Sequence, residues 1–88
     1  MKLICFIDLF NENARIYSWS EADDTQTFLS RTPVATLSEN LATISNISGV
    51  NHITLIGAPV FAEALVPEII EYAKTRYSNN ELIVEVMQ

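Results

Sequence analysis

Few side chains in this chain could do chemistry, and the two best-placed carboxylates are Asp8 and Glu39. Asp8 lies in the nearly continuous apolar run Leu3–Phe10, and Glu39 closes the tetrapeptide Thr36-Leu37-Ser38-Glu39. Carboxylates that converge on two metal ions ~4 Å apart could bind the attacking and leaving oxygens of a phosphodiester. The alternative is structural: Asp8 ends a strand beside a turn, and Glu39 caps a helix.

The only cysteine, Cys5, and the only histidine, His52, could form a thiol–imidazole pair. Strand alternation predicts that Cys5 points to one face of a sheet and His52 to the other, which favours a buried core thiol. One Cys and one His do not build a metal site without further ligands. We therefore predict no metal, no cofactor and no catalytic residue. A chain without a disulfide framework is typical of a reducing compartment, which predicts a cytoplasmic location.

Length and charge narrow the class of protein further. The 88 residues, 49% of them hydrophobic, predict one domain over 1–88 with a single core. The formal charge is −6, and the five basic residues are scattered along the sequence. Nucleic-acid surfaces need clustered basic side chains, so we expect no nucleic-acid partner and no anionic membrane partner. No apolar stretch approaches the ~18 residues of a membrane span.

The first third of the chain predicts three antiparallel strands. Leu3–Phe10 has the continuous apolar character of a strand covered on both faces. Asn11-Glu12-Asn13 is a turn, and Ala14–Trp19 alternates as a second strand. Thr25–Leu29 is rich in β-branched and aromatic residues, which favours a third strand.

The remainder alternates helix and strand. The capping-box pattern predicts a helix over residues 36–47, and Gly49 is a natural C-cap. A strand over residues 53–57 follows, and Ala58-Pro59 opens a second helix. Its apolar stripe recurs every four residues as far as Tyr77, and Pro67 predicts a kink or a restart. A last strand is expected over residues 81–87.

The order β-β-β-α-β-α-β, with Ile7-Asp8 late in the first strand and Ile56-Gly57-Ala58-Pro59 after the fourth, resembles the ribonuclease H-like core shared by actin-like ATPases and Holliday-junction resolvases. The resemblance implies a mixed five-stranded sheet. It also implies two alternatives, a metal-dependent phosphodiesterase or nuclease and a degenerate nucleotide-binding domain. Asp8 matches the family's first carboxylate and Glu39 approximates the second, whereas Gly57-Ala58-Pro59 lacks the third. The hairpin Asp8–Asn13 lacks the phosphate-binding glycines of the ATPases.

Right-handed crossovers would place both helices on the same face of this sheet. The other face would then be open, and an open face rich in Phe and Ile is unusual for a monomer. The aromatic and basic row Arg15, Tyr17 and Trp19 would lie near its edge. We predict a small non-catalytic interaction or accessory module, acting as a homodimer or on another protein; a partly exposed monomer is the alternative. The expected interface residues are Ile4, Phe6, Phe10, Tyr17, Trp19, Ile56, Ile83 and Met87.

Overall fold

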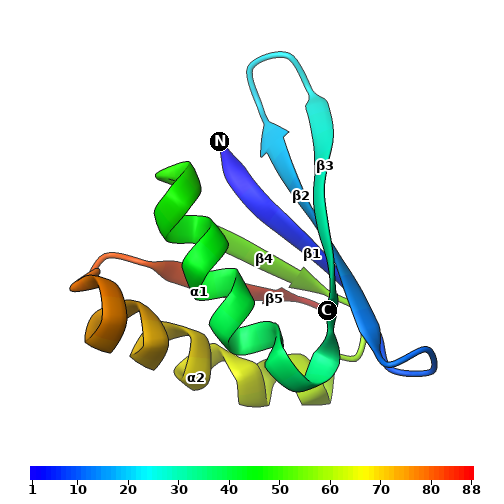
Figure 1. Ribbon diagram of the computed structural model, residues 1–88. Coiled ribbons are helices and arrows are strands. Elements are labelled where there is room, and N and C mark those ends of the chain that lie inside the picture. The colour runs from blue at the N-terminus through cyan, green and yellow to red at the C-terminus, as the bar shows by residue number, and fades with distance from the viewer.

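The computed structural model describes residues 1–88 as an α/β fold with a mixed five-stranded sheet and two α-helices (Figure 1), which confirms the predicted class. In chain order the elements are β1 (Lys2–Asp8), β2 (Asn13–Ser20), β3 (Thr25–Pro33), the 3-10 turn η1 (Val34–Thr36), α1 (Leu37–Ser48), β4 (His52–Ile56), α2 (Pro59–Tyr77) and β5 (Ile83–Met87).

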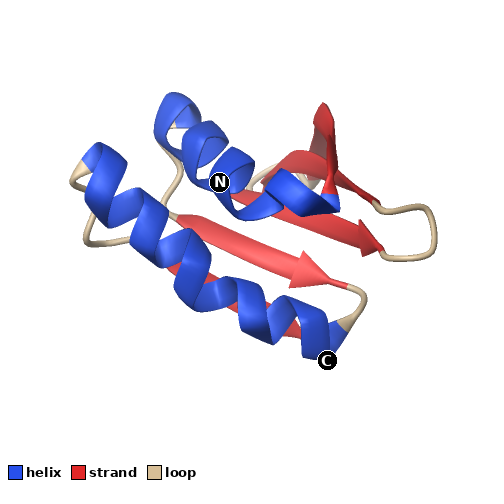
Figure 2. Cartoon of the chain, turned by 60° about the horizontal axis from the view of Figure 1, so that its bottom comes forward, coloured by secondary structure: helices blue, strands red, loops and turns tan.

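The five strands lie in the order β3-β2-β1-β4-β5. β1 pairs antiparallel with β2, which pairs antiparallel with β3, whereas β4 joins β1 and β5 joins β4 in parallel. Figure 2 shows α1 and α2 side by side over the same face of the sheet. The opposite face has no helix over it, and it is called the open face below.

A core of sixteen buried residues fills the space between the sheet and the helices. Strand alternation supplies one side of it, because Leu3, Cys5 and Ile7 all point from β1 toward the helices. The helices contribute residues at helical spacing, among them Leu41 of α1 and Ile69 of α2, both fully buried. The core therefore fixes which residues of each strand are left on the open face.

The first strand is shorter than the sequence predicts, because it ends at Asp8 and not at Phe10. One carboxylate oxygen of Asp8 accepts the backbone N–H of Asn11 at 3.1 Å, and the other accepts the Asn11 side-chain amide at 2.7 Å. These bonds start the turn two residues early. Phe10 consequently lies in the turn with 95% of its surface exposed, so its predicted place on the sheet face is wrong.

β3 is present but longer than predicted, since it continues from Thr25 to Pro33. A β-bulge interrupts its pairing with β2: Ile16 pairs with Ser30 and Tyr17 with Phe28, so Leu29 is the extra residue. β5 begins at Ile83, two residues later than expected.

The helices also depart from the prediction in detail. The capping box is wrong: Thr36 precedes α1 without a side-chain cap bond, and Glu39 turns instead to Arg76 of α2, at 2.6 Å. Helix α2 continues through Pro67 without a restart, and that residue is exposed, where a missing N–H is least costly. Gly49 is the left-handed C-cap of α1, with φ of 66°, as predicted.

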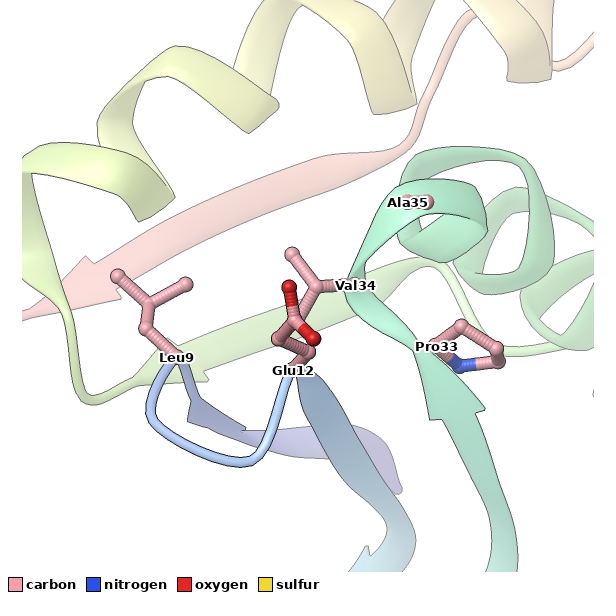
Figure 3. Close-up of a pocket in the computed structure, with 5 residues that line it drawn as sticks. All are labelled: Leu9, Glu12, Pro33, Val34 and Ala35. Atoms are coloured by element: carbon pink, nitrogen blue, oxygen red, sulfur yellow. The ribbon is translucent and has the colours of Figure 1, made fainter.

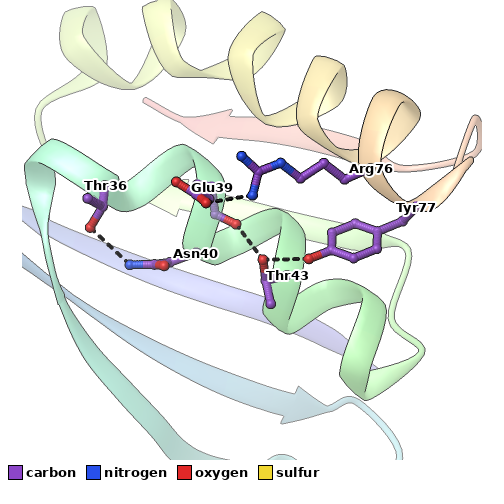
Figure 4. A network of polar contacts seen from close by, with 6 residues as sticks. All are labelled: Thr36, Glu39, Asn40, Thr43, Arg76 and Tyr77. Atoms are coloured by element: carbon purple, nitrogen blue, oxygen red, sulfur yellow. Dashed lines mark hydrogen bonds and ion pairs between the residues drawn. The ribbon is translucent and has the colours of Figure 1, made fainter.

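Polar contacts hold the two helices together (Figure 4). Besides the Glu39–Arg76 pair, the hydroxyls of Thr43 and Tyr77 lie 2.8 Å apart. The Thr43 hydroxyl also donates to the carbonyl of Glu39 at 3.0 Å, so Tyr77 is the donor between them. These contacts fix α2 against α1 and leave both helices on the same side of the sheet.

Candidate interaction face of the sheet

The strand register arranges the open face as three rows of side chains that cross the whole sheet. From β3 to β5, the first row is Gln26, Trp19, Lys2, His52 and Ile83; the middle row is Phe28, Tyr17, Ile4, Thr54 and Glu85; the third row is Arg31, Arg15, Phe6, Ile56 and Met87. Every predicted interface residue except Phe10 lies in one of these rows.

Aromatic rings form a continuous line over β1, β2 and β3. The rings of Phe6 and Tyr17 meet edge to face, with centroids 5.7 Å apart and planes at 87°. Tyr17 meets Phe28 in the same way, at 5.5 Å and 73°. The guanidinium of Arg15 lies over the Phe6 ring, 5.5 Å from its centroid. Each ring of the line is therefore in contact with a neighbouring ring or cation on the open face.

Side chains in the middle of the open face are buried among their neighbours, whereas side chains at both of its margins are exposed. Ile4, on the central strand, is only 8% exposed. Phe28 at the β3 margin is 54% exposed, and Ile83 and Met87 at the β5 margin are 56% and 55% exposed. A monomer thus leaves large apolar side chains in water along two parallel edges of the same surface.

Trp19 is fixed at the end of β2 by the turn that follows. Its indole N–H donates to Asp24 at 2.9 Å, and the ammonium of Lys2 lies 4.7 Å from the ring centroid. Lys2 also lies 3.8 Å from Glu21 in that turn. At this edge of the open face, an aromatic ring therefore contacts both a cation and a carboxylate.

The fold brings together basic side chains that look scattered in the sequence. Lys2, Arg15 and Arg31, three of the five basic residues, lie on the open face. Two acidic strand residues, Asp8 and Glu85, share it, so the strand residues of this face have a net charge of +1, whereas the chain as a whole has −6. Strand pairing thus joins basic positions that are far apart in the sequence.

The β4–β5 half of the face has a different chemistry from the β2–β3 half. Its carboxylate, Glu85, lies 2.9 Å from the ring nitrogen of His52. Beside it Thr54 is 4% exposed, and its buried hydroxyl oxygen has no hydrogen-bond partner. Aliphatic side chains surround this pair. The two halves are thus aromatic and basic on one side, aliphatic and acidic on the other.

The residues considered for catalysis are not brought together as a site. The two bonds from Asn11 lower the pKa of Asp8 below its ordinary value, and Glu39 is paired with Arg76 on the helix layer. Cys5 lies in the core, where burial raises its pKa to about 12, whereas His52 lies on the open face. No group of three Asp, Glu, His or Cys side chains is close enough to hold a metal ion.

A hollow lies at the end of the sheet where the β1–β2 turn meets the start of η1. Figure 3 shows Leu9, Glu12 and Val34 rising on the same side of it, with Pro33 and Ala35 completing the lining. The Val34 backbone N–H donates to the Glu12 carbonyl at 3.0 Å, which joins the two segments that line it. With one carboxylate and no basic group among its lining residues, the hollow lacks the donors that would bind a phosphate.

Comparison of the sequence with protein-family models and with curated proteins gives no match. Neither helix combines the length and the apolar character needed to cross a lipid bilayer.

Sequence reasoning missed Phe28 as a member of the face. The sequence did hold an indication of it: Gln26 and Phe28 are two residues apart on the predicted third strand, so their side chains point to the same side of the sheet. Because the bulge at Leu29 shifts the register, the alternation alone did not show which side of the sheet these two side chains are on. Arg31 was missed for a similar reason, since it lay beyond the predicted end of the strand.

Proposed function

We propose that this protein is a small non-catalytic interaction module that forms a homodimer through the open face of its sheet. The observation that carries the proposal is the line of Phe6, Tyr17 and Phe28, which ends in a half-exposed ring with no element of the chain over it. Aromatic and arginine side chains are enriched at the centres of protein interfaces, and large exposed apolar patches are rare in monomers.

The size of the face supports an interface of modest strength. Strands ~4.8 Å apart and five to nine residues long give a face of roughly 500 Å² per protomer, hence roughly 1,000 Å² buried in a dimer. That area lies at the low end of specific interfaces, so we expect a dimer that dissociates in the micromolar range. Charge at the margins would then contribute to orientation more than to affinity.

The alternative functions have less support. A metal-dependent phosphodiesterase would need Asp8 and Glu39 free to bind metal, but Asn11 and Arg76 occupy them. A degenerate nucleotide-binding domain would need phosphate-binding N–H groups at the β1–β2 turn, where the side chain of Asp8 already takes the N–H of Asn11. Both alternatives therefore require rearrangement of contacts that the fold already uses.

We further propose that the topology is ribonuclease H-like and that the protein works in the cytoplasm. The first proposal is supported by the strand order β3-β2-β1-β4-β5 with β4 and β5 parallel to β1. The second is supported by Cys5, a free thiol with no disulfide partner. Since one fold hosts many functions, the topology adds nothing to the functional proposal.

The test compares two substitutions that each replace an exposed apolar side chain with a carboxylate. Phe28→Asp alters the open face, whereas Val60→Asp alters α2, where the side chain is 87% exposed. Sedimentation equilibrium should show that Phe28→Asp weakens the dimer at least tenfold and that Val60→Asp leaves it unchanged. Equal effects of the two substitutions, or none, would contradict the use of the open face.

A further inference from the structure

We infer how the second copy is oriented: a two-fold axis runs along β1, between the two sheets, so that β2 and β3 of one protomer cover β4 and β5 of the other. This inference rests on the proposed homodimer and specifies its geometry. A two-fold interface uses the same patch on both copies, so the patch must be complementary to itself. The orientation of the dimer is therefore the rotation that places each region of the open face against a chemically complementary region of the partner's open face.

The strand order makes this axis possible. β1 is the middle strand of five, with β2 and β3 on one side and β4 and β5 on the other. Rotation about an axis parallel to β1 leaves each row at the same position along the strands. It places the β2–β3 side of one protomer over the β4–β5 side of the other. β3 then lies over the partner's β5, β2 over the partner's β4, and β1 over the partner's β1. Sheets that pack face to face with nearly aligned strands are a common arrangement.

The two sides that this rotation brings together are chemically complementary. The β2–β3 half carries the aromatic rings with Arg15 and Arg31, and the β4–β5 half carries aliphatic side chains with Glu85. Arg31 comes to lie above the partner's Met87, two residues along β5 from the partner's Glu85. An arginine side chain spans that distance, so each Arg31 reaches the partner's Glu85, and the pair occurs twice.

The other in-plane axis, perpendicular to the strands, gives a poorer match. It places β3 over the partner's β3, and the middle row of one protomer over the middle row of the other. Glu85 would then meet the partner's Glu85, and Phe28 would meet the partner's Phe28, with Arg31 left away from any carboxylate of β5. Like charges brought together at an interface act against binding. The axis along β1 also brings Lys2 over the partner's Lys2 and Asp8 over the partner's Asp8. Both lie at the ends of the central strand and already have partners, since Glu21 lies 3.8 Å from Lys2 and Asn11 donates two hydrogen bonds to Asp8. The exposed charges Arg31 and Glu85, which only the axis along β1 brings together, therefore favour that axis.

Single-stranded nucleic acid is the other ligand that aromatic rings and basic side chains on a sheet could bind. Two observations disfavour it. Arg15 lies over the Phe6 ring and Lys2 over the Trp19 ring, so the ring faces that a base would stack on have cations over them. The net charge of +1 also offers few phosphate contacts, and such contacts supply most of the non-specific affinity.

The experiment exchanges the two charges, using Arg31→Glu and Glu85→Arg. Both residues are exposed at the margins of the face. Arg31→Glu breaks no side-chain contact, whereas Glu85→Arg removes the contact of Glu85 with His52 on the same protomer. Each variant alone places like charges opposite each other twice, so its dimer should dissociate at about tenfold higher concentration or more. Mixed in equal amounts, the two variants regain both opposite-charge pairs, and the heterodimer should form within about threefold of the wild-type concentration.

Glu71→Arg is the matched control, because Glu71 is an exposed carboxylate on α2 and its reversal should leave the dimer unchanged. Circular dichroism verifies that each variant is folded. A mixture that stays monomeric, or a Glu85→Arg variant that dimerises like wild type, overturns the orientation. If Phe28→Asp still disrupts the dimer in that case, the homodimer stands with another geometry.

A further arm of the experiment separates the two classes of ligand. Fluorescence anisotropy of a labelled ten-nucleotide oligouridine should show no binding by the wild-type protein at 10 μM and 150 mM salt. Binding that Arg31→Glu abolishes, together with a monomeric wild type, would overturn the inference in favour of nucleic acid.

Discussion

The ring of Tyr17 lies between those of Phe6 and Phe28 and meets both edge to face, at 5.7 Å and 5.5 Å. Tyr17 therefore links the central strand β1 to the edge strand β3 across the open face. Each such aromatic pair contributes about 0.5–1.5 kcal/mol beyond the burial of the rings. The line of three rings is both a part of the monomer's stability and the proposed centre of its interface.

Replacement of Tyr17 should test the first of these roles. Tyr17→Ala removes both aromatic contacts and is expected to lower the free energy of unfolding by about 3 kcal/mol. Urea denaturation followed by circular dichroism would measure the change. Phe10→Ala is the control, since a side chain 95% exposed in a turn should change stability by less than about 0.5 kcal/mol. Equal losses for the two variants would contradict the packing described for Tyr17.

Gly57 is the position at which we expect the backbone to be least tolerant. Its φ is 86°, and a Cβ there would lie 2.7 Å from the carbonyl oxygen of Ile7. Gly57→Ala combines left-handed strain of about 1–2 kcal/mol with this backbone clash, so a total loss of about 3 kcal/mol is expected. Gly49→Ala has a similar φ of 66° with open space around the Cβ, and it should lose only the strain. Thermal unfolding of the two variants separates clash from strain, and equal midpoints would contradict the close approach to Ile7.

Thr54 is expected to be better replaced by an apolar residue of the same shape. Its hydroxyl oxygen is buried without a partner, which costs about 1–3 kcal/mol relative to a satisfied or exposed group. Thr54→Val should therefore raise the free energy of unfolding by about 1 kcal/mol, measured by urea denaturation. Ser38→Ala is the contrast, because the Ser38 hydroxyl donates to Glu68 at 2.8 Å and its loss should destabilise. A destabilised Thr54→Val variant would show that the hydroxyl has a partner in solution.

Acid should weaken the β1–β2 turn. The side chain and then the backbone N–H of Asn11 bind the ionised Asp8, which lowers the pKa of that carboxyl below its ordinary value of 3.8. A lowered folded-state pKa means that the contribution to stability is complete above the unfolded value and is lost as pH falls through the folded value. Asp8→Ala should therefore lower the thermal midpoint at pH 7 and have little effect near pH 2. A difference from wild type that stays constant between these pH values would contradict the role of the charge.

The fold class and the inward side of β1, β4 and β5 could be predicted from the sequence because those features follow from local patterns. Alternation along β1 placed Cys5 in the core and Phe6 on the open face, and the spacing along α2 placed Leu65 and Ile69 inward. Such patterns depend on one element at a time, so a single sequence is sufficient to detect them.

The errors arose where two elements compete for the same side chain. Glu39 had the spacing of a capping residue, but Arg76, 37 positions away in the sequence, offers a charged partner. Asp8 ended β1 early because Asn11 supplied two donors. The convergence of Arg15 and Arg31 likewise depends on the pairing of β2 with β3, whose register is shifted by a bulge that no local pattern announces.

The most direct test of the central proposal is the solution mass of the wild-type protein, measured by light scattering from 1 to 200 μM. The chain mass is 9.9 kDa. We predict a mass that rises toward twice this value over the series, with a midpoint in the micromolar range, as the open faces of two copies meet. A mass that stays at that of one chain at 200 μM would contradict the homodimer.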